Sequence, residues 1–384
     1  MRSIRDFGVL PGRPGEGNAR ALQDAIDWAS ARGGELYVDP SGEPYPIAGG
    51  VVLRENVSIL GANGPVGRGT THPRKAQPTG SVFQIEDEAR PIFTVESSSR
   101  IEGLQFWYPA QGLDDPSEVI EYPPTIQVSQ GSAVYGCTFS KLTFYGEFAA
   151  FDFAASKEHP CELILWEHCY GYPLSGEFIK LDYCYDVPRL LHCHVNPSNQ
   201  RLIRGGYSPE LVDSVINRET YAYSVDHTDN AQLLGLFSFG TYGGVNLGAA
   251  SYGQLTNFNF DCVTVGISKS GDSDKNRNWM ASQGSIIANA GYDVDRIHPV
   301  LVNGRGHLGL SNVEAFSGEN SALKTVAGES ADFIRIEGDE PLSVTMNGCR
   351  MSGYSKDDPV VVKNPAATVR AIGCLDRDGA FYDR

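Results

Sequence analysis

Acidic side chains occupy matching positions in several strand-like segments of the sequence. The segments AAFDFA, IKLDYC and YSVDHT carry Asp152, Asp182 and Asp226, and Asp229 follows shortly after the last of these. Apolar neighbours place the carboxylates within or at the ends of strands, where an acid must face a groove or find a partner. Two acids in one groove repel each other, which raises the pKa of one and suits it to general acid catalysis. The pattern therefore predicts catalytic roles for Asp182, Asp226 and Asp229. Asp152 is predicted to contact substrate, and solvated acids or turn caps are the alternative interpretation of the set.

Histidines close to these acids could transfer protons or hold sugar hydroxyls. His227 stands directly beside Asp226, which favours a catalytic role in proton transfer or hydrogen bonding. In LLHCHV, an inward Cys193 turns His192 and His194 outward, so both are predicted to contact substrate. A histidine metal site and a plain surface ladder are the alternatives. We predict no metal and no cofactor.

One arginine and several aromatic residues are further candidates for binding a sugar. Arg204, in NQRLIRGGYSPE, could bind a uronate carboxylate or act as the base of a lyase, and pairing with Glu210 or Asp213 is the alternative. Flat aromatic rings on loops and coil edges suit sugar stacking, although many aromatic residues of a solenoid belong to its core. The rings predicted to contact substrate are Trp107, Tyr223 and Trp279.

A short helix precedes all of these segments. Asn18 is a plausible N-cap, because its side chain can accept hydrogen bonds from the first-turn N–H groups. The apolar residues that follow fall at helical spacing, and they are Leu22, Ala25, Ile26 and Ala29. A Gly33-Gly34 pair then ends the pattern. These features predict a helix over residues 18–33, which is too short to bury its face alone and would cap the strands that follow.

The rest of the sequence repeats a strand–turn–strand pattern. Examples are PIFTVESSSRIEGLQFWYP, EFIKLDYCYDVPRLLHCHVNP and DFIRIEGDEPLSVTMNGCRMSG. Such self-similarity indicates a solenoid, in which alternate apolar residues stack on the next coil, and it fits a sandwich or a propeller less well. Equivalent outward carboxylates would lie about 5 Å apart on adjacent coils and about 10 Å apart two coils away. Retaining glycosidases need about 5–5.5 Å between their carboxyls and inverting ones about 6.5–9.5 Å, so a coil face can supply either.

Three stretches interrupt this repeat. We predict inserted loops at 61–80, 107–124 and 265–285, which could wall a groove because long ordered loops on a rigid scaffold usually carry function. No linker, charge run or low-complexity tract divides the chain, so a single domain over 1–384 is predicted.

The N-terminal features resemble those of the pectate lyase-like superfamily. An Asp-Phe-Gly run, an Ala-Ile helix, a Gly-Gly turn, a Tyr-Val strand and an Ile-Leu-Gly strand end occur in the order typical of that superfamily. The matching residues are Asp6, Phe7, Gly8, Ala25, Ile26, Gly33, Gly34, Tyr37, Val38, Ile59, Leu60 and Gly61. The resemblance implies an all-β fold, a right-handed single-stranded parallel β-helix with a short N-terminal capping α-helix, and activity on carbohydrates. The motifs of polygalacturonase-related members are absent, so no catalytic residue is transferred from the family.

Composition argues against some classes of binding partner and bears on the cellular compartment. The formal net charge of −16 argues against nucleic acid and anionic membranes as partners. No apolar run approaches the roughly 18 residues that span a bilayer. No signal peptide is seen, and we expect an extracellular or periplasmic protein from which one has been removed, with a cytoplasmic or virion protein as alternatives. The eight cysteines contain no C-x-x-C pair, which favours buried thiols over disulfides such as Cys161–Cys169 or Cys184–Cys193.

These features favour one function among several. We predict a glycoside hydrolase or glycosyl-transferring enzyme that acts on a polysaccharide or oligosaccharide through paired carboxylates. A polysaccharide lyase acting on a uronate polymer, and a non-catalytic glycan-binding or virion spike module, are the alternatives. The chain is expected to be a monomer or a homotrimer.

Overall fold

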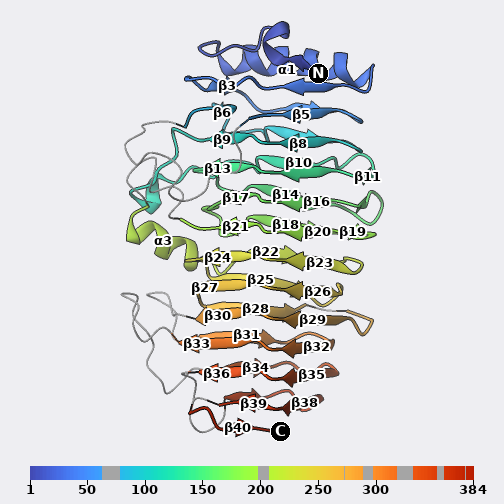
Figure 1. Ribbon diagram of the computed structural model, residues 1–384, viewed down its shortest axis with the longest axis vertical. Helices are drawn as coiled ribbons and strands as arrows, with labels where there is room; N and C mark the ends of the chain where they lie inside the picture. The colour runs from blue at the N-terminus through green and yellow to red at the C-terminus, as the bar shows by residue number, and fades with distance from the viewer. Residues whose placement is uncertain are drawn as a thin grey trace. The chain divides into compact units, whose positions relative to one another are not determined.

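The computed structural model describes residues 1–62, 78–197, 207–271, 273–288, 297–317, 332–352, 359–376 and 378–384 (Figure 1). The predicted loop 61–80 lies mostly outside these residues, and Arg204 lies outside them altogether. Contacts divide the chain into an N-terminal unit, Met1–Val212, and a C-terminal unit, Asp213–Arg384. The single domain predicted from the sequence stays a prediction.

Each unit is a right-handed parallel β-helix, as the sequence predicted. Figure 1 shows its strands as successive coils, and each sheet collects one strand from every coil. In the N-terminal unit the first sheet is β1 (Arg2–Ser3), β2 (Glu35–Tyr37), β5 (Ser58–Leu60), β8 (Arg100–Glu102), β12 (Thr138–Ser140), β16 (Leu165–Glu167) and β20 (Arg189–Leu191). The second is β4 (Val51–Leu53), β7 (Phe93–Val95), β10 (Ile126–Val128), β14 (Phe151–Ala154) and β18 (Ile179–Asp182). The third is β3 (Tyr45–Ile47), β6 (Val82–Ile85), β9 (Gln105–Trp107), β13 (Thr143–Tyr145), β17 (Tyr170–Gly171) and β21 (His194–Val195). A small fourth sheet holds β11 (Val134–Tyr135), β15 (Cys161–Glu162) and β19 (Cys184–Tyr185).

The C-terminal unit repeats the three-sheet arrangement. Its first sheet is β23 (Ala231–Leu234), β26 (Gly253–Thr256), β29 (Asn278–Ser282), β32 (Gly306–Ser311), β35 (Leu342–Asn347) and β38 (Ala367–Ile372). The second is β22 (Tyr221–Val225), β25 (Gly243–Gly248), β28 (Val265–Ser270), β31 (His298–Val302), β34 (Ile334–Ile336) and β37 (Val360–Val362). The third is β24 (Phe237–Phe239), β27 (Asn259–Val263), β30 (Ser285–Ala288), β33 (Glu314–Ser317), β36 (Arg350–Ser352), β39 (Cys374–Leu375) and the antiparallel β40 (Phe381–Tyr382).

Helical segments complete the part of the chain that the structure describes. They are η1 (Ile4–Phe7), α1 (Gly15–Ser30), η2 (Pro116–Glu118) and α3 (Pro209–Ile216). Among the described residues, none of the helices combines the length and the apolar character needed to cross a membrane.

Strand register brings equivalent side chains of neighbouring coils together in the core. Phe106 of β9 pairs with Phe144 of β13 in the sheet, and their rings stack with centroids 5.1 Å apart. Phe139 of β12 likewise stacks on Trp166 of β16 at 5.8 Å. All eight cysteines are buried and free, which confirms that they are core thiols. The core is therefore built from ladders of like residues, each repeated from coil to coil.

The predicted capping helix exists but begins earlier than expected. Helix α1 starts at Gly15 after Pro14, which occupies the N-cap position without a side-chain bond. Asn18 is fully buried inside the helix, and its amide binds the backbone of Leu10, Arg13 and Pro46 instead of capping the first turn. The prediction of Asn18 as N-cap is therefore wrong, because its side chain satisfies the preceding loop and strand β3.

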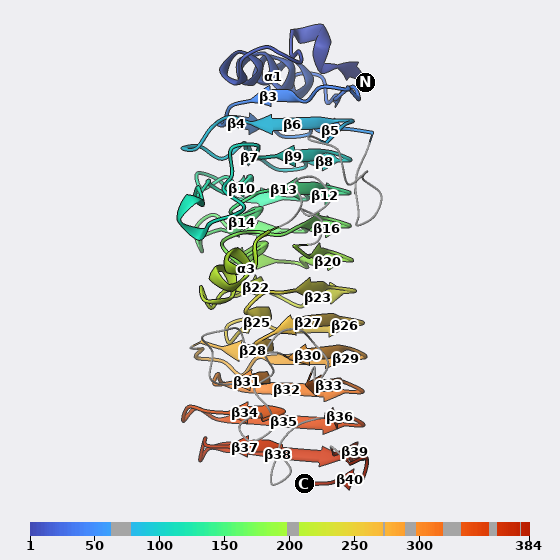
Figure 2. The same ribbon diagram turned by 90° about the vertical axis from the view of Figure 1, so that its left-hand side faces the viewer.

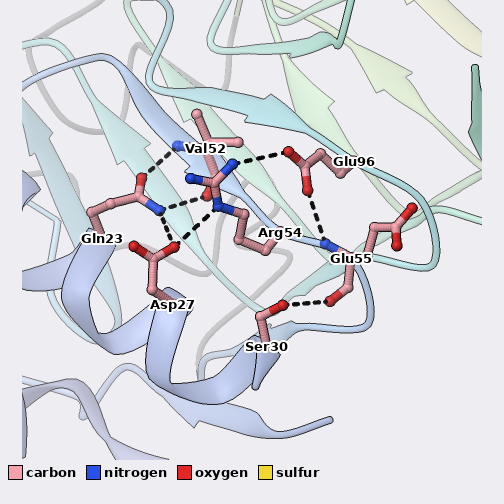
Figure 3. Close-up of polar contacts among 7 residues, drawn as sticks. All are labelled: Gln23, Asp27, Ser30, Val52, Arg54, Glu55 and Glu96. Carbon is pink, nitrogen blue, oxygen red and sulfur yellow. Dashed lines mark hydrogen bonds and ion pairs between the residues drawn. The ribbon is translucent and has the colours of Figure 1, made fainter. Parts of the chain in front are cut away.

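Helix α1 covers the free edge of strand β4 (Figures 1 and 2). Figure 3 shows the Gln23 amide paired in both directions with Val52, since it donates to the Val52 carbonyl at 3.1 Å and accepts from its N–H at 2.8 Å. Arg54 adds ion pairs to Asp27 and to Glu96, each at 3.0 Å. The Gln23 amide thus supplies the hydrogen bonds that another strand would otherwise provide.

The stretch 265–285 is not an inserted loop. Residues Val265–Ser270 form β28 and Asn278–Ser282 form β29, so that only a short polar segment separates the two strands. The density of Gly, Ser, Asp and Asn in that segment suggested a long loop, whereas the flanking residues keep the strand alternation. The region 107–124 begins with the last residue of β9 and contains η2, and its role as an inserted loop stays a prediction.

The Gln23 contact can be tested by substitution. Gln23→Ala leaves the N–H and carbonyl of Val52 without their partners, and the free energy of unfolding is expected to fall by about 1–3 kcal/mol. Urea denaturation measures the change. Asp24→Ala, at an exposed position on the same helix, is the matched control and should stay within about 0.5 kcal/mol of the parent protein. Equal losses in both variants would contradict the assigned role of Gln23.

A buried acid gives the N-terminal unit a pH-dependent stability. Glu147 is fully buried and accepts a hydrogen bond from the Tyr172 N–H at 2.6 Å. Burial raises the pKa of Glu147 to about 8. The folded state therefore holds this proton more tightly than the unfolded chain, so the free energy of unfolding falls as the pH rises from about 4.5 to about 8.

Glu147→Gln removes that contribution, because an amide cannot ionise. Relative to the parent protein, the variant should gain stability steadily between about pH 5 and pH 8, by about 1.4 kcal/mol for each pKa unit of the shift. Urea unfolding at several pH values measures the difference between the two proteins. A difference that does not change with pH would show that Glu147 is not protonated in the folded protein.

Candidate functional site

One turn of the C-terminal unit, between β22 and β23, carries two of the acids predicted from the sequence, Asp226 and Asp229. Asp226 directly follows β22, and its Oδ1 accepts the His227 N–H at 2.9 Å. Its Oδ2 lies 3.6 Å from Nδ1 of His227, and the two side chains are 44% and 39% exposed, which leaves both open to a ligand. His227 has a φ of +36°, and other non-glycine residues at the coil corners, such as His192, also have a positive φ.

A glycine in the next coil makes room for the Asp226 carboxylate. Val225 pairs with Leu247 in the sheet, so that Asp226 and Gly248 occupy equivalent positions on neighbouring coils. A Cβ atom at position 248 would lie 2.3 Å from Oδ1 and 2.6 Å from Cγ of Asp226. Any side chain at position 248 would therefore displace the carboxylate.

The second acid of this corner is held by a neighbouring tyrosine. The Tyr252 hydroxyl, in the turn before β26, donates a hydrogen bond to Oδ1 of Asp229. The guanidinium of Arg277, in the turn before β29, lies 5.1 Å from the centroid of the Tyr252 ring. Tyr252 thus orients Asp229 of the preceding coil, and Arg277 of the following coil contacts the Tyr252 ring.

A lysine lies buried in the same unit. Lys269 of β28 pairs in register with Leu247 and Val302, which are both core residues, and it is itself fully buried. Its ammonium donates to the Arg305 carbonyl at 2.5 Å. Burial lowers the pKa of Lys269 to about 8, against an attraction to Asp226 that acts in the opposite direction. The cation therefore contributes to the electrostatic surroundings of Asp226 without contacting solvent.

The aromatic rings predicted to stack on sugars are buried. Tyr223 and Trp279 are 0% exposed and Trp107 is 8% exposed. The Tyr223 hydroxyl donates to the Phe237 carbonyl, and the Trp279 indole donates to Ser251. These rings face the core, where no sugar can reach them, which corrects their predicted role as substrate contacts.

The remaining predicted residues lie in the N-terminal unit. Asp152 accepts from the Ala154 N–H at 2.9 Å, and Asp182 accepts from the Tyr183 N–H at 2.9 Å, so each carboxylate bonds its local backbone. Their roles in binding and catalysis stay predictions.

Two of the predicted histidines belong to ring ladders. His192 is a corner residue with a φ of +54°, and its ring stacks on His168 at 5.2 Å. The His194 ring lies 5.2 Å from the ring of Tyr170. These contacts fit the surface-ladder alternative, and a role in binding substrate stays a prediction for both histidines.

The sequence interpretation missed Tyr252, Lys269 and Arg277. Lys269 could have been found, since it continues the inward phase of Val265 and Ile267 in VGISKS. A lysine at an apolar phase is unusual enough to mark a site. Tyr252 and Arg277 lie in turns of unequal length, where no strand alternation predicts which coils will meet.

Comparison with known proteins identifies the fold. No family model matches the sequence, and no curated protein does. Among solved structures, the A-module of the mannuronan C-5 epimerase AlgE6 of Azotobacter vinelandii aligns over 98% of this chain and 99% of its own, with 14% identity and a TM-score of 0.53. The Agl-KA catalytic domain aligns over 97% of this chain and 68% of its own, with 11% identity and a TM-score of 0.56.

A viral protein is similar to the same extent. A mutant tailspike of E. coli bacteriophage HK620, in complex with a pentasaccharide, aligns over 96% of this chain with 13% identity and a TM-score of 0.56. This chain spans only 66% of that tailspike. The chain therefore shares the parallel β-helix fold of several carbohydrate-active proteins. At these identities the likeness concerns the fold alone.

The packing of Asp226 against Gly248 can be tested by a double-mutant cycle. Gly248→Ala should lower the free energy of unfolding by about 1–3 kcal/mol, because the new methyl group collides with the carboxylate. The same substitution in an Asp226→Gly background should cost much less, since the colliding atoms are gone. Chemical denaturation of the four proteins gives the coupling energy, which should exceed about 0.5 kcal/mol. Strict additivity would rule out the contact.

Proposed function

We propose that this protein is a carbohydrate-active enzyme that cleaves or transfers glycosidic bonds of a polysaccharide or oligosaccharide. One observation carries the proposal. The exposed pair of Asp226 and His227 shares a turn with a second carboxylate, Asp229, which Tyr252 holds in place. Glycosidic bond cleavage requires a proton donor for the leaving oxygen and a second carboxylate that acts as base or nucleophile.

The proposed roles follow from the contacts of each residue. Asp226, beside the imidazole of His227, would give its proton to the leaving oxygen and later recover one from water. Asp229, oriented by the Tyr252 hydroxyl, would activate water or attack the sugar carbon. Asp226, His227 and Asp229 share one turn of a solenoid, and Tyr252 holds Asp229 from the next coil, so these groups need little rearrangement when substrate binds, which favours catalysis.

Charge and fold support a glycan as the substrate. The net charge of −16 disfavours phosphate-rich partners but leaves an uncharged sugar polymer unaffected. Similar folds occur in a mannuronan epimerase and in a tailspike bound to a pentasaccharide. An extracellular or surface location is part of this proposal, and a homotrimer and a monomer are both compatible with it.

Asp226→Asn tests the proposed function. The variant should release reducing ends from its glycan at least about 100-fold more slowly than the parent protein, because the proton donor is lost. Its melting temperature should change little, since the side chain is half exposed. A screen of neutral and uronate glycans, read by reducing ends and by absorbance at about 235 nm, identifies the substrate. Only unsaturated products absorb there, since β-elimination removes the proton next to the uronate carboxyl, expels the glycosidic oxygen and leaves a double bond conjugated with that carboxyl.

Asp274→Asn is the matched control, because it removes the same charge from an exposed turn. It should keep full activity. Asp182→Asn, made in parallel, tests the catalytic role predicted for that residue from the sequence. Full activity in Asp226→Asn would refute the assignment of this corner as the active site. An unsaturated product would indicate a lyase, and glycan binding with no product would indicate a non-catalytic module.

A further inference from the structure

A second polar site lies on the first sheet of the C-terminal unit. Four residues occupy the same register position on the consecutive strands β29, β32, β35 and β38, and they are Asn278, His307, Ser343 and Thr368. Together with Asn276 they line an open cavity of about 310 Å³. This volume falls at the lower end of the range for small-molecule sites.

His307 organises the polar groups of this cavity. Its Nδ1 lies 2.8 Å from the Ser343 hydroxyl, and its Nε2 lies 3.2 Å from the hydroxyl of Thr345. Burial lowers the pKa of His307, and the nearby Lys269 ammonium lowers it further, against a hydrogen bond with Ser343 that raises it. The imidazole is therefore neutral at neutral pH, and it fixes both hydroxyls through one donated and one accepted hydrogen bond.

The side chains that line the cavity match an uncharged polyhydroxylated ligand. They offer two amides, an imidazole and two hydroxyls, and none of them carries a formal charge at neutral pH. Two cations of the same unit already have partners. Arg305 pairs with Glu340 at 2.6 Å, and the Lys269 ammonium donates to the Arg305 carbonyl. The cavity thus supplies hydrogen bonds in both directions, which suits sugar hydroxyls better than a carboxylate.

The cavity lies farther along the same unit than the turn that holds Asp226 and Asp229. Asn276 directly precedes Arg277, whose guanidinium lies over the Tyr252 ring beside Asp229. Strands β32 and β35 follow β23 by three and four coils in the sheet order. At about 4.8 Å for each coil, the centre of the cavity lies roughly 15–20 Å along the solenoid from the coil of Asp229. A glycan chain laid along this corner would reach it after a few sugar residues.

We propose that this cavity is a distal subsite that binds an uncharged sugar residue of the polysaccharide, several residues from the bond that is cleaved. The assignment of the subsite to a cleaved chain rests on the function proposed above. Binding itself is independent of catalysis, so the two can fail separately. The subsite implies that the substrate is a polymer rather than a disaccharide.

Calorimetric titration of the Asp226→Asn protein tests the subsite without turnover. The probes are cello-, malto- and mannohexaose, with hexagalacturonate as the charged comparison. At least one neutral hexasaccharide should bind, and His307→Ala should weaken it at least tenfold. Asn278→Ala, at an exposed position, should weaken it severalfold without affecting the fold. Asn347→Ala, exposed at the far end of β35, is the control and should leave the dissociation constant unchanged.

Three results would overturn the subsite. They are binding of none of the neutral hexasaccharides, a dissociation constant unaffected by His307→Ala and Asn278→Ala, and tighter binding of hexagalacturonate that depends on His307. In the active protein, His307→Ala should raise KM for the hexasaccharide and leave kcat and the disaccharide KM unchanged. Activity retained in Asp226→Asn alongside His307-dependent binding would refute the catalytic assignment and keep the subsite.

Discussion

The in-register pairing of parallel strands is the constraint on which this structure depends. Each strand lies about 4.8 Å from the equivalent strand of the next coil, so every side chain meets the one at the same phase. The same rule that stacks Phe106 on Phe144 in the core places Gly248 beside Asp226 at the surface. Residues far apart in sequence therefore become neighbours without any local motif, and a change in one coil is felt mainly in the two adjoining ones.

This constraint explains which features could be predicted from the sequence. Period-two alternation and polar corners suffice for the coil architecture, because each coil obeys them independently. The alternation also indicates that Tyr223 and Trp279 are buried. Tyr223 shares its phase with the buried Val225, and Trp279 shares its phase with the buried Ala281. Attention to aromatic type rather than to phase led to the prediction that these two rings were exposed.

Other features could not be predicted in this way. The hydrogen bond from Tyr252 to Asp229 joins two turns of different length, and turn conformation is not set by strand alternation. The predicted start of α1 rested on Asn18 as the N-cap, but its amide bonds to Pro46, a residue in a strand that follows the helix. The polar composition of the segment between β28 and β29 led to the prediction of a long insertion, although both flanking strands keep their alternation. In the first two cases a tertiary contact overrode a local preference.

The amide of Gln23 on the edge of β4 has a consequence for the assembly of the protein. A stack of parallel coils ends in unpaired backbone groups that could template a further chain, as the growing tip of a fibril does. The Gln23 amide pairs with the backbone of Val52 as a strand residue would, but it offers no further backbone groups to which another strand could add. The outward backbone groups of Val52 in the first coil are therefore already paired, and we infer that this disfavours end-to-end addition of another β-helix at that tip.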